Sequence, residues 1–393
     1  MTTDPPGCRY GSESHPVLPR SGAVSKPQRV VRFGMQTSRT ATAFLVSLPL
    51  ALGALAGTAG PAAAQPDIAP QNDAPNPYAT IVDWAMLPDG REWGSTGGVD
   101  MDRDGRHVWV AERCGGNSCA GLDLDPILKF DPAGSLVASF GAGLMIQPHG
   151  LHVDPEGNVW VTDAQGPDGV DPNREGKGHV AMKFSPAGEL LLTLGTPGVG
   201  AAGRDTLDQP CDVVVADDGT IYVADGHGGQ LPGAGPHTTA RVVKFAPDGS
   251  YLAEWGSHGS GPGQFRTPHA IDLDSRGRVV VADRGNDRLQ VFDPNGMFIE
   301  AFYQYSRPSG LHIAADDTVY VADSASSRNG QHPGWEYGIR IGNLRDGSLD
   351  WFIDGSNPEG VTVAADGTVY GAVVAFGGAL LKYVRPDVPG GER

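Results

Sequence analysis

One two-strand phrase occurs six times in this chain of 393 residues and limits its fold more than any other feature. In each copy, apolar and polar residues alternate, a short turn rich in Asp, Gly or Pro follows, and the alternation then resumes. This pattern is typical of an antiparallel β-hairpin. The spacing between copies, 40 to 62 residues, is typical of the blades of a β-propeller. The copies begin at Gly98, Gly150, Asp212, Ala270, Gly310 and Gly360.

Two more strands are expected after each hairpin. The third ends in Lys-Phe-x-Pro-x-Gly or a relative, and fourth strands are expected at 136–140, 190–194, 251–255, 298–302 and 349–353. Only five fourth strands follow in order, and we expect the sixth at 80–84, where it would complete the last blade and close the ring. We therefore predict an all-β, six-bladed β-propeller of four-stranded blades over residues 78–385, with a tail at 386–393. The 57 glycines and 32 prolines suit a chain with many tight turns.

The first 64 residues have a different composition. Three arginines, Arg29, Arg32 and Arg39, precede an apolar run at 43–56 and small residues at 62–64. This order predicts a secretory signal cleaved before Gln65, followed by a linker at 65–77, with Met35 as an alternative start. The alternative interpretation is a retained membrane anchor, although the apolar run is short for a span. We expect a secreted or periplasmic protein with no stable membrane span after cleavage.

Net charge argues against one class of partner. Without residues 1–64 the chain keeps 23 basic and 44 acidic residues, a net charge of −21. Such a surface repels phosphate backbones, and the sequence has no basic cluster, so we expect no nucleic-acid binding. We also expect a monomer.

The cysteines predict one local crosslink. Cys114 and Cys119 flank a short Gly-rich loop, and in an exported protein this spacing favours a disulfide over metal ligation, because no second cysteine pair exists. Cys211 is left unpaired.

The residue that precedes each copy carries most of the functional information. These residues are Gly97, His149, Cys211, His269, Ser309 and Glu359. In a six-bladed ring, the second, fourth and sixth lie about 120° apart, so His149, His269 and Glu359 could hold Zn²⁺, or Fe²⁺ as an alternative. The other interpretation is that Pro-His is merely a tolerated entry to the inner strand. Cys211, at the same level of the ring, could be a bystander or a fourth ligand.

Long loops follow the second strands on the same face as these residues, and three side chains there are candidates for catalysis. Arg113 and Arg284 each follow a second strand and could clamp a substrate carboxylate, or they could form ordinary surface ion pairs. His227 could act as a base or an additional ligand, or lie exposed in its loop. By contrast, the aspartates that end four second strands are interpreted as turn caps, since a structural role predicts such repetition.

The repeats resemble the NHL family of six-bladed propellers. Within it, the segments 148–163 and 267–292 are similar to peptidyl-α-hydroxyglycine α-amidating lyases, which form a peptide amide and glyoxylate. The resemblance implies zinc held by three channel histidines, arginines for the substrate carboxylate, a tyrosine base and a structural calcium. By position it assigns His149 and His269 to zinc, and Arg113 and Arg284 to the carboxylate.

Two positions depart from that family pattern. Glu359 stands where the third histidine is expected, and His227 stands where the tyrosine is expected. Gly360 also replaces the Asp after the third ligand, which weakens the expectation of calcium. We therefore expect an exported zinc lyase acting on a small molecule or peptide with a carboxylate. A non-catalytic propeller that binds a peptide, glycan or protein is the alternative, and a lactonase-like hydrolase is the second.

Overall fold

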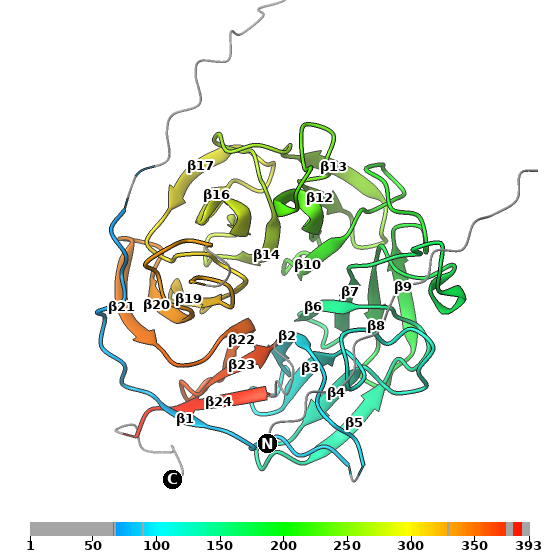
Figure 1. Ribbon diagram of the computed structural model, residues 1–393, viewed down its shortest axis with the longest axis horizontal. Coiled ribbons are helices and arrows are strands. Elements are labelled where there is room, and N and C mark those ends of the chain that lie inside the picture. The colour runs from blue at the N-terminus through cyan, green and yellow to red at the C-terminus, as the bar shows by residue number, and fades with distance from the viewer. Residues whose placement is uncertain (1–65, 67, 89, 328–330, 375–379, 387–393) are drawn as a thin grey trace, which may run out of the picture. The chain divides into compact units, whose positions relative to one another are not determined.

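Six antiparallel sheets of four strands each surround a common axis in the computed structural model (Figure 1). The structure describes residues 66, 68–88, 90–327, 331–374 and 380–386. The predicted signal at 1–64 and most of the predicted tail lie outside these residues. Within the described residues, no helix has the length and apolar character needed to span a membrane.

Each blade follows the order inner hairpin, third strand, outer strand. The first blade is β2 (Thr96–Met101), β3 (Val108–Glu112), β4 (Ile127–Phe130) and β5 (Leu136–Phe140). The second is β6 (Pro148–Val153), β7 (Val159–Asp163), β8 (Val180–Phe184) and β9 (Leu190–Leu194). The third is β10 (Pro210–Val215), β11 (Ile221–Asp225), β12 (Arg241–Phe245) and β13 (Tyr251–Trp255).

The second half of the ring repeats this order. The fourth blade is β14 (Pro268–Leu273), β15 (Val279–Asp283), β16 (Arg288–Phe292) and β17 (Phe298–Phe302). The fifth is β18 (Gly310–Ile313), β19 (Thr318–Asp323), β20 (Gly338–Asn343) and β21 (Ser348–Ile353). The sixth is β22 (Pro358–Val363), β23 (Val369–Val373), β24 (Leu380–Val384) and β1 (Ala79–Ile81). In the described part of the chain, three short 3₁₀ helices lie in loops after second strands: η1 (Pro172–Arg174), η2 (His227–Gln230) and η3 (Arg284–Asn286).

The ring closes as predicted, since β1 pairs antiparallel with β24, with Thr80 opposite Tyr383 (Figure 1). The strand is shorter than the expected 80–84 and ends at Ile81. Asp83 adopts a left-handed conformation with φ 57°, which breaks the extended backbone. Beyond this break, Trp84 packs against Tyr370 of β23 with a ring-centroid distance of 5.1 Å.

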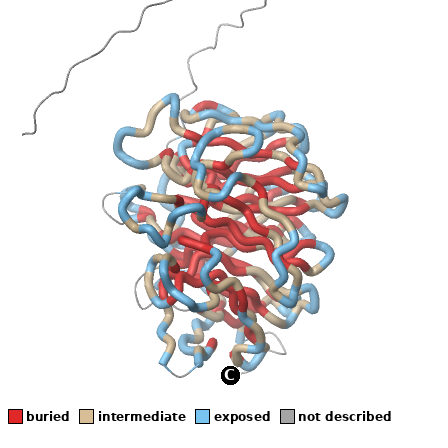
Figure 2. Tube along the Cα trace, turned by 90° about the vertical axis from the view of Figure 1, so that its right-hand side faces the viewer, coloured by how far each residue is buried: buried red, intermediate tan, exposed pale blue. Residues whose placement is uncertain are grey.

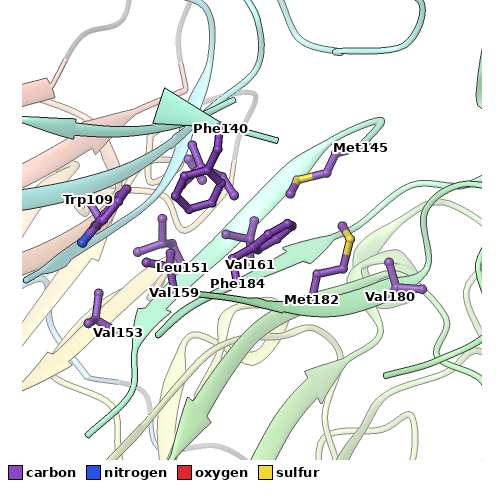
Figure 3. Packing of buried hydrophobic residues seen from close by; sticks show 12 residues of the cluster. Trp109, Phe140, Met145, Leu151, Val153, Val159, Val161, Val180, Met182 and Phe184 are labelled. Carbon is purple, nitrogen blue, oxygen red and sulfur yellow. The ribbon is translucent and has the colours of Figure 1, made fainter. Parts of the chain in front are cut away.

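The hydrophobic core lies between successive blades rather than in one centre. Figure 3 shows one such cluster, in which Trp109 of the first blade lies near Phe140, and Phe140 near Phe184 of the second blade. The ring centroids of these two pairs are 5.5 and 5.3 Å apart. Buried segments run through the middle of the molecule, and exposed segments lie mainly in the loops at its surface (Figure 2). Burial between blades therefore fixes each blade against its neighbour and holds the axis-facing residues in register.

Candidate metal and substrate site

A β-bulge at the start of the inner strand presents each axis-facing side chain. The pairing of inner and second strands shifts register at or beside the residue before the repeat in the five blades whose inner strand includes it. A bulge re-aims a side chain that would otherwise follow the alternation of the strand. Pro148, Pro268 and Pro358 precede His149, His269 and Glu359, and a proline fits here because it has no N–H for the ladder. All six residues before the repeats line one axial cavity.

Three histidines converge at the entrance to this channel. One ligating nitrogen from each of His149, His227 and His269 lies within 4.8 Å of the others. The ring centroids of His149 and His269 are 4.7 Å apart, and His227 lies 5.2 Å from each. His149 and His269 come from inner strands of alternate blades, whereas His227 begins η2 in the loop between them. Tetrahedral zinc holds its ligand nitrogens about 3.4 Å apart, so these three nitrogens could share one metal ion after a small contraction of the cluster.

The backbone of the next blade orients two of these rings. Nδ1 of His149 lies 2.8 Å from the carbonyl oxygen of Cys211, and Nδ1 of His269 lies 2.6 Å from that of Ser309. A carbonyl oxygen only accepts, so each Nδ1 carries the proton and each Nε2 keeps its lone pair. This arrangement fixes the ring orientation and tautomer that a metal-binding histidine needs.

Burial keeps all three imidazoles in the neutral form. It lowers the pKa of His149 and of His227 well below the ordinary value, assisted by the charges of neighbouring histidines and arginines. The pKa of His269 falls to about 3, from burial first and then the charge of Arg284. Neutral imidazole is the form that binds a metal ion.

Gly226 places His227 in this cluster. It adopts φ 129°, a conformation that L side chains rarely occupy, and a Cβ there would lie 2.1 Å from the carbonyl oxygen of Thr239. The chain can therefore turn sharply after β11 and begin η2 with His227 facing the axis.

Glu359 lies beside the histidines, and two hydrogen bonds hold its carboxylate. Its Oε1 accepts from Nη1 of Arg284 at 3.0 Å, and its Oε2 accepts from the hydroxyl of Ser324. Burial alone would raise the pKa of Glu359, but the charge of Arg284 and hydrogen bonding hold it well below its usual range. Glu359 is therefore a fixed anion at the edge of the cluster.

One contact in the cluster indicates a place for a cation. Nε2 of His269 is buried, faces no hydrogen-bond donor among the described residues, and lies 3.2 Å from Oε1 of Glu359. Because Nδ1 of His269 holds the proton, this contact brings two electron-pair donors together. A divalent metal ion bound to Nε2 of His269 would use this lone pair and attract the neighbouring carboxylate, so the residues present fit such an ion.

A larger cavity of about 520 Å³ opens above the cluster, on the face that carries the long loops. Its lining includes His149, His227, Arg284 and Glu359, together with loop residues that come mostly from the first three blades. Arg113, at the wall, donates from Nε to the carbonyl oxygen of Pro148 at 3.1 Å and from Nη1 to Oδ1 of Asn117 at 2.6 Å. Burial lowers the pKa of Arg113 to about 10, so its side chain is still a cation at neutral pH.

The two predicted arginines have different partners. Arg113 keeps Nη2 without a hydrogen bond to another described residue. Arg284 donates to Glu359 and places Nη2 3.3 Å from Nε2 of His227. Both arginines line the cavity, but in this structure Arg113 keeps a free donor whereas Arg284 is paired with Glu359.

The remaining predicted site residues lie on the same face. Cys114 and Cys119 form a disulfide, and Cys211 is a buried free thiol whose carbonyl holds His149. The aspartates that end second strands accept backbone N–H groups, as a capping role requires; Asp163, for example, accepts from Ile146 and Gln147.

Two polar residues of the site were missed from the sequence. Ser324 directly follows β19, at the position that Arg113 and Arg284 occupy in their blades, so aligning the repeats at that position would have found it. Asn117 lies inside the disulfide loop, outside the repeated phrase, and no spacing indicated its role.

Comparisons with known proteins agree with this architecture. Residues 265–292 match the NHL repeat. The mouse NHL repeat-containing protein 3 is 36% identical over 237 residues, which span 58% of this chain and 61% of the mouse protein. Peptidyl-alpha-hydroxyglycine alpha-amidating lyase 1 of Drosophila melanogaster is 30% identical over 226 residues, which span 53% of this chain and 38% of that protein. The chain thus covers less than two thirds of either relative.

A gluconolactonase structure from Xanthomonas campestris shares the fold alone. It is 15% identical, with a TM-score of 0.50, covering 84% of this chain and 99% of that one. The chain is a six-bladed β-propeller, and residues 265–292 of its fourth blade match the NHL repeat. Among such propellers, it resembles the peptidyl-α-hydroxyglycine amidating lyases.

Proposed function

We propose that this protein is an exported, metal-dependent lyase of the amidating-lyase type. It would cleave the carbon–nitrogen bond of a substrate that carries a hydroxyl group and a carboxylate on the same carbon. The observation that carries this proposal is the convergence of three neutral imidazoles, two of them oriented by carbonyl groups of the next blade, beneath an open cavity with a cationic wall. The similarity to amidating lyases supports the substrate class.

Different side chains of the site would bind the metal and the substrate. His149, His227 and His269 would hold zinc, with iron as the alternative. A bound metal would supply a Lewis acid that lowers the pKa of the substrate hydroxyl. Arg113 would bind the carboxylate and fix the substrate in the cavity. In this ligand set, His227 from the third blade takes the place of Glu359. The family pattern alone would favour Glu359 as the third ligand.

Glu359 would act as the proton carrier. Arg284 and Ser324 hold its carboxylate beside Nε2 of His269, at the base of the cavity. In this position it can accept the hydroxyl proton as the carbonyl group of glyoxylate forms. It can then return the same proton to the departing amide nitrogen, so that the step balances without another reactant.

The test combines metal content with product release. The protein beginning at Gln65, refilled with zinc, should contain about one metal per chain by mass spectrometry. It should also release glyoxylate from N-benzoyl-α-hydroxyglycine. His149→Ala, His269→Ala and His227→Ala should each lose the metal, because each removes a ligand.

Glu359→Gln separates the two ligand sets. If Glu359 carries the proton, this variant should keep stoichiometric zinc, with affinity lowered about 10- to 100-fold as for a neighbour of a ligand. Its kcat should fall by about 100-fold or more. Loss of zinc in Glu359→Gln with retention in His227→Ala would show that Glu359 is the third ligand. A wild-type protein that binds no metal and releases no glyoxylate would contradict the enzyme and favour a ligand-binding propeller.

A further inference from the structure

A short crosslinked loop forms one wall of the substrate cavity. It follows β3, where Cys114 adopts φ 54°, and the disulfide to Cys119 closes it. The N–H of Gly115 donates to Oε1 of Glu112 at 2.6 Å, and the N–H of Cys119 donates to the carbonyl oxygen of Ile146 at 2.7 Å. Both ends of the loop are therefore tied to the framework.

The anchor at Glu112 is itself buried and paired. Its Oε1 also accepts from the N–H of Gly94 at 2.7 Å, and its Oε2 accepts from Nη2 of Arg91 at 2.7 Å. A buried carboxylate with three charge-assisted partners forms a rigid support. The loop that starts beside it is held by more than the disulfide.

Within the loop, Asn117 meets Arg113 side chain to side chain. Nη1 of Arg113 lies 2.6 Å from Oδ1 of Asn117. A guanidinium only donates, so the amide oxygen must face Arg113, which leaves the Nδ2 donors for another partner. Among the described residues, neither Nδ2 of Asn117 nor Nη2 of Arg113 makes a hydrogen bond, and both residues line the cavity.

We propose that Asn117 is a specificity-determining residue which, with Arg113, binds the substrate carboxylate, and that the Cys114–Cys119 disulfide positions it. The inference rests on the proposed function for the identity of the carboxylate substrate. Arg113 contributes charge and Nη2, and Asn117 contributes Nδ2, so two donors from different side chains face one anion. Since Arg284 is engaged with Glu359, Asn117 supplies the second donor that a two-arginine clamp would have supplied.

This pairing explains how the site would discriminate between related ligands. A carboxylate offers only acceptors, which match the donors of Arg113 and Asn117. A carboxamide of the same shape turns an N–H₂ group toward at least one of these donors and leaves it unpaired. An unpaired polar group in a partly desolvated site lowers affinity strongly, so the carboxylate should be preferred.

The test measures binding without turnover. N-benzoylglycine, which lacks the reactive hydroxyl, and its carboxamide are titrated by calorimetry into the zinc-supplied protein. The wild type should prefer the carboxylate. Asn117→Ala should weaken N-benzoylglycine binding about tenfold, as expected for one hydrogen bond to a charged group, and leave the carboxamide almost unaffected. Asn117→Asp should weaken carboxylate binding further, because a second anion would pair with Arg113.

Two further variants isolate the position and the crosslink. Asn295→Ala, at an exposed turn after β16, is the matched control and should bind as the wild type does. Cys114→Ser/Cys119→Ser should show a loss similar to that of Asn117→Ala while keeping its zinc, because the histidines lie outside the loop. Should this double variant fail to fold, Asn117→Ala alone decides the role of Asn117.

Each outcome bears on one proposal. Equal binding of N-benzoylglycine by Asn117→Ala and the wild type would overturn the inference, even if the wild type releases glyoxylate. An Asn117-dependent preference for the carboxylate in a protein that releases no glyoxylate would support the inference and contradict the lyase. Absence of carboxylate binding by the wild type would overturn the inference as well.

Discussion

At the scale of single residues, neighbouring blades decide what an axis-facing side chain can do. His149 and His269 can act as ligands through Nε2 because each Nδ1–H donates a hydrogen bond to a backbone carbonyl oxygen. These carbonyl groups belong to Cys211 and Ser309, each at the start of the following blade. Glu359 is an anion because Arg284 and Ser324 hold it. The identity of each residue supplies the chemistry, and its partner in another blade selects the protonation state.

The protonation state of Asp212 is likewise set by its surroundings at the ring axis. Asp212 follows Cys211 and lines the channel. At the equivalent position, four of the other five blades have glycine and one has alanine: Gly98, Gly150, Ala270, Gly310 and Gly360. Burial raises the pKa of Asp212 from 3.8 to about 7, although N–H donors from Ile271 and Val213 oppose the shift. At pH values between about 4 and 7, the carboxyl of Asp212 therefore binds more protons in the folded protein than in the unfolded chain.

This proton gives a signed prediction for stability. Between pH 4 and 7 the folded state binds more protons at Asp212 than the unfolded state does, so the contribution of Asp212 to stability falls as pH rises. Relative to Asp212→Asn, the wild type should lose as much as about 4 kcal/mol of unfolding free energy across this range, at about 1.4 kcal/mol per pKa unit. Urea unfolding at several pH values measures the difference. Asp218→Asn, at an exposed turn, should keep the wild-type slope above pH 5, and a parallel slope in Asp212→Asn would contradict the assignment.

At the scale of strands and blades, the turn residues determined the boundaries well. The outer strands expected at 136–140, 190–194, 251–255 and 298–302 match β5, β9, β13 and β17. The recurring Pro-x-Gly turns before them, in which Gly134, Gly188 and Gly249 have positive φ, explain this accuracy. The bulges that aim His149, His269 and Glu359 at the axis leave no comparable signal, since they depend on the pairing of two strands.

The packing between blades predicts where stability is concentrated. Trp109 is fully buried between the first and second blades and donates from Nε1 to Oδ2 of Asp102 at 2.9 Å. Trp109→Ala should lower the unfolding free energy by about 3–5 kcal/mol, because the lost contacts and the cavity add. Leu190→Ala, on an exposed outer strand, should change it by no more than about 0.5 kcal/mol. Denaturant unfolding compares the two; a smaller effect at Trp109 than at Leu190 would show that the interface repacks.

At the scale of the whole propeller, closure depends on a strand distant in sequence. Residues 79–81 pair with the last blade, and Asn76 donates to Asp354 of the fifth blade at 2.8 Å. A closed ring leaves no free sheet edge between its first and last blades. The segment 76–81 therefore contacts the fifth and sixth blades, whose other strands come from the C-terminal part of the chain.

Removing this closure should weaken the ring. A protein that begins after Val82 loses β1 and exposes the edge of β24, so its thermal midpoint should fall by several degrees or more relative to one that begins at Pro66. Circular dichroism follows the loss of strand structure, and light scattering follows association through the exposed edge. Identical midpoints for the two proteins would mean that the other blades hold the ring without β1.

The sequence by itself determined the number of blades, the closure, the face that carries the site and the positions of His149 and His269. Each of these depends on local alternation and on turns that recur at a regular spacing, which a single sequence records. Only the tertiary structure decided that His227 lies with the two histidines, that Arg284 neutralises Glu359, and that Asn117 turns toward Arg113. These contacts join residues 4 to 78 positions apart. Their geometry comes from bulges, loop anchoring and burial, because only packing of the blades fixes those distances.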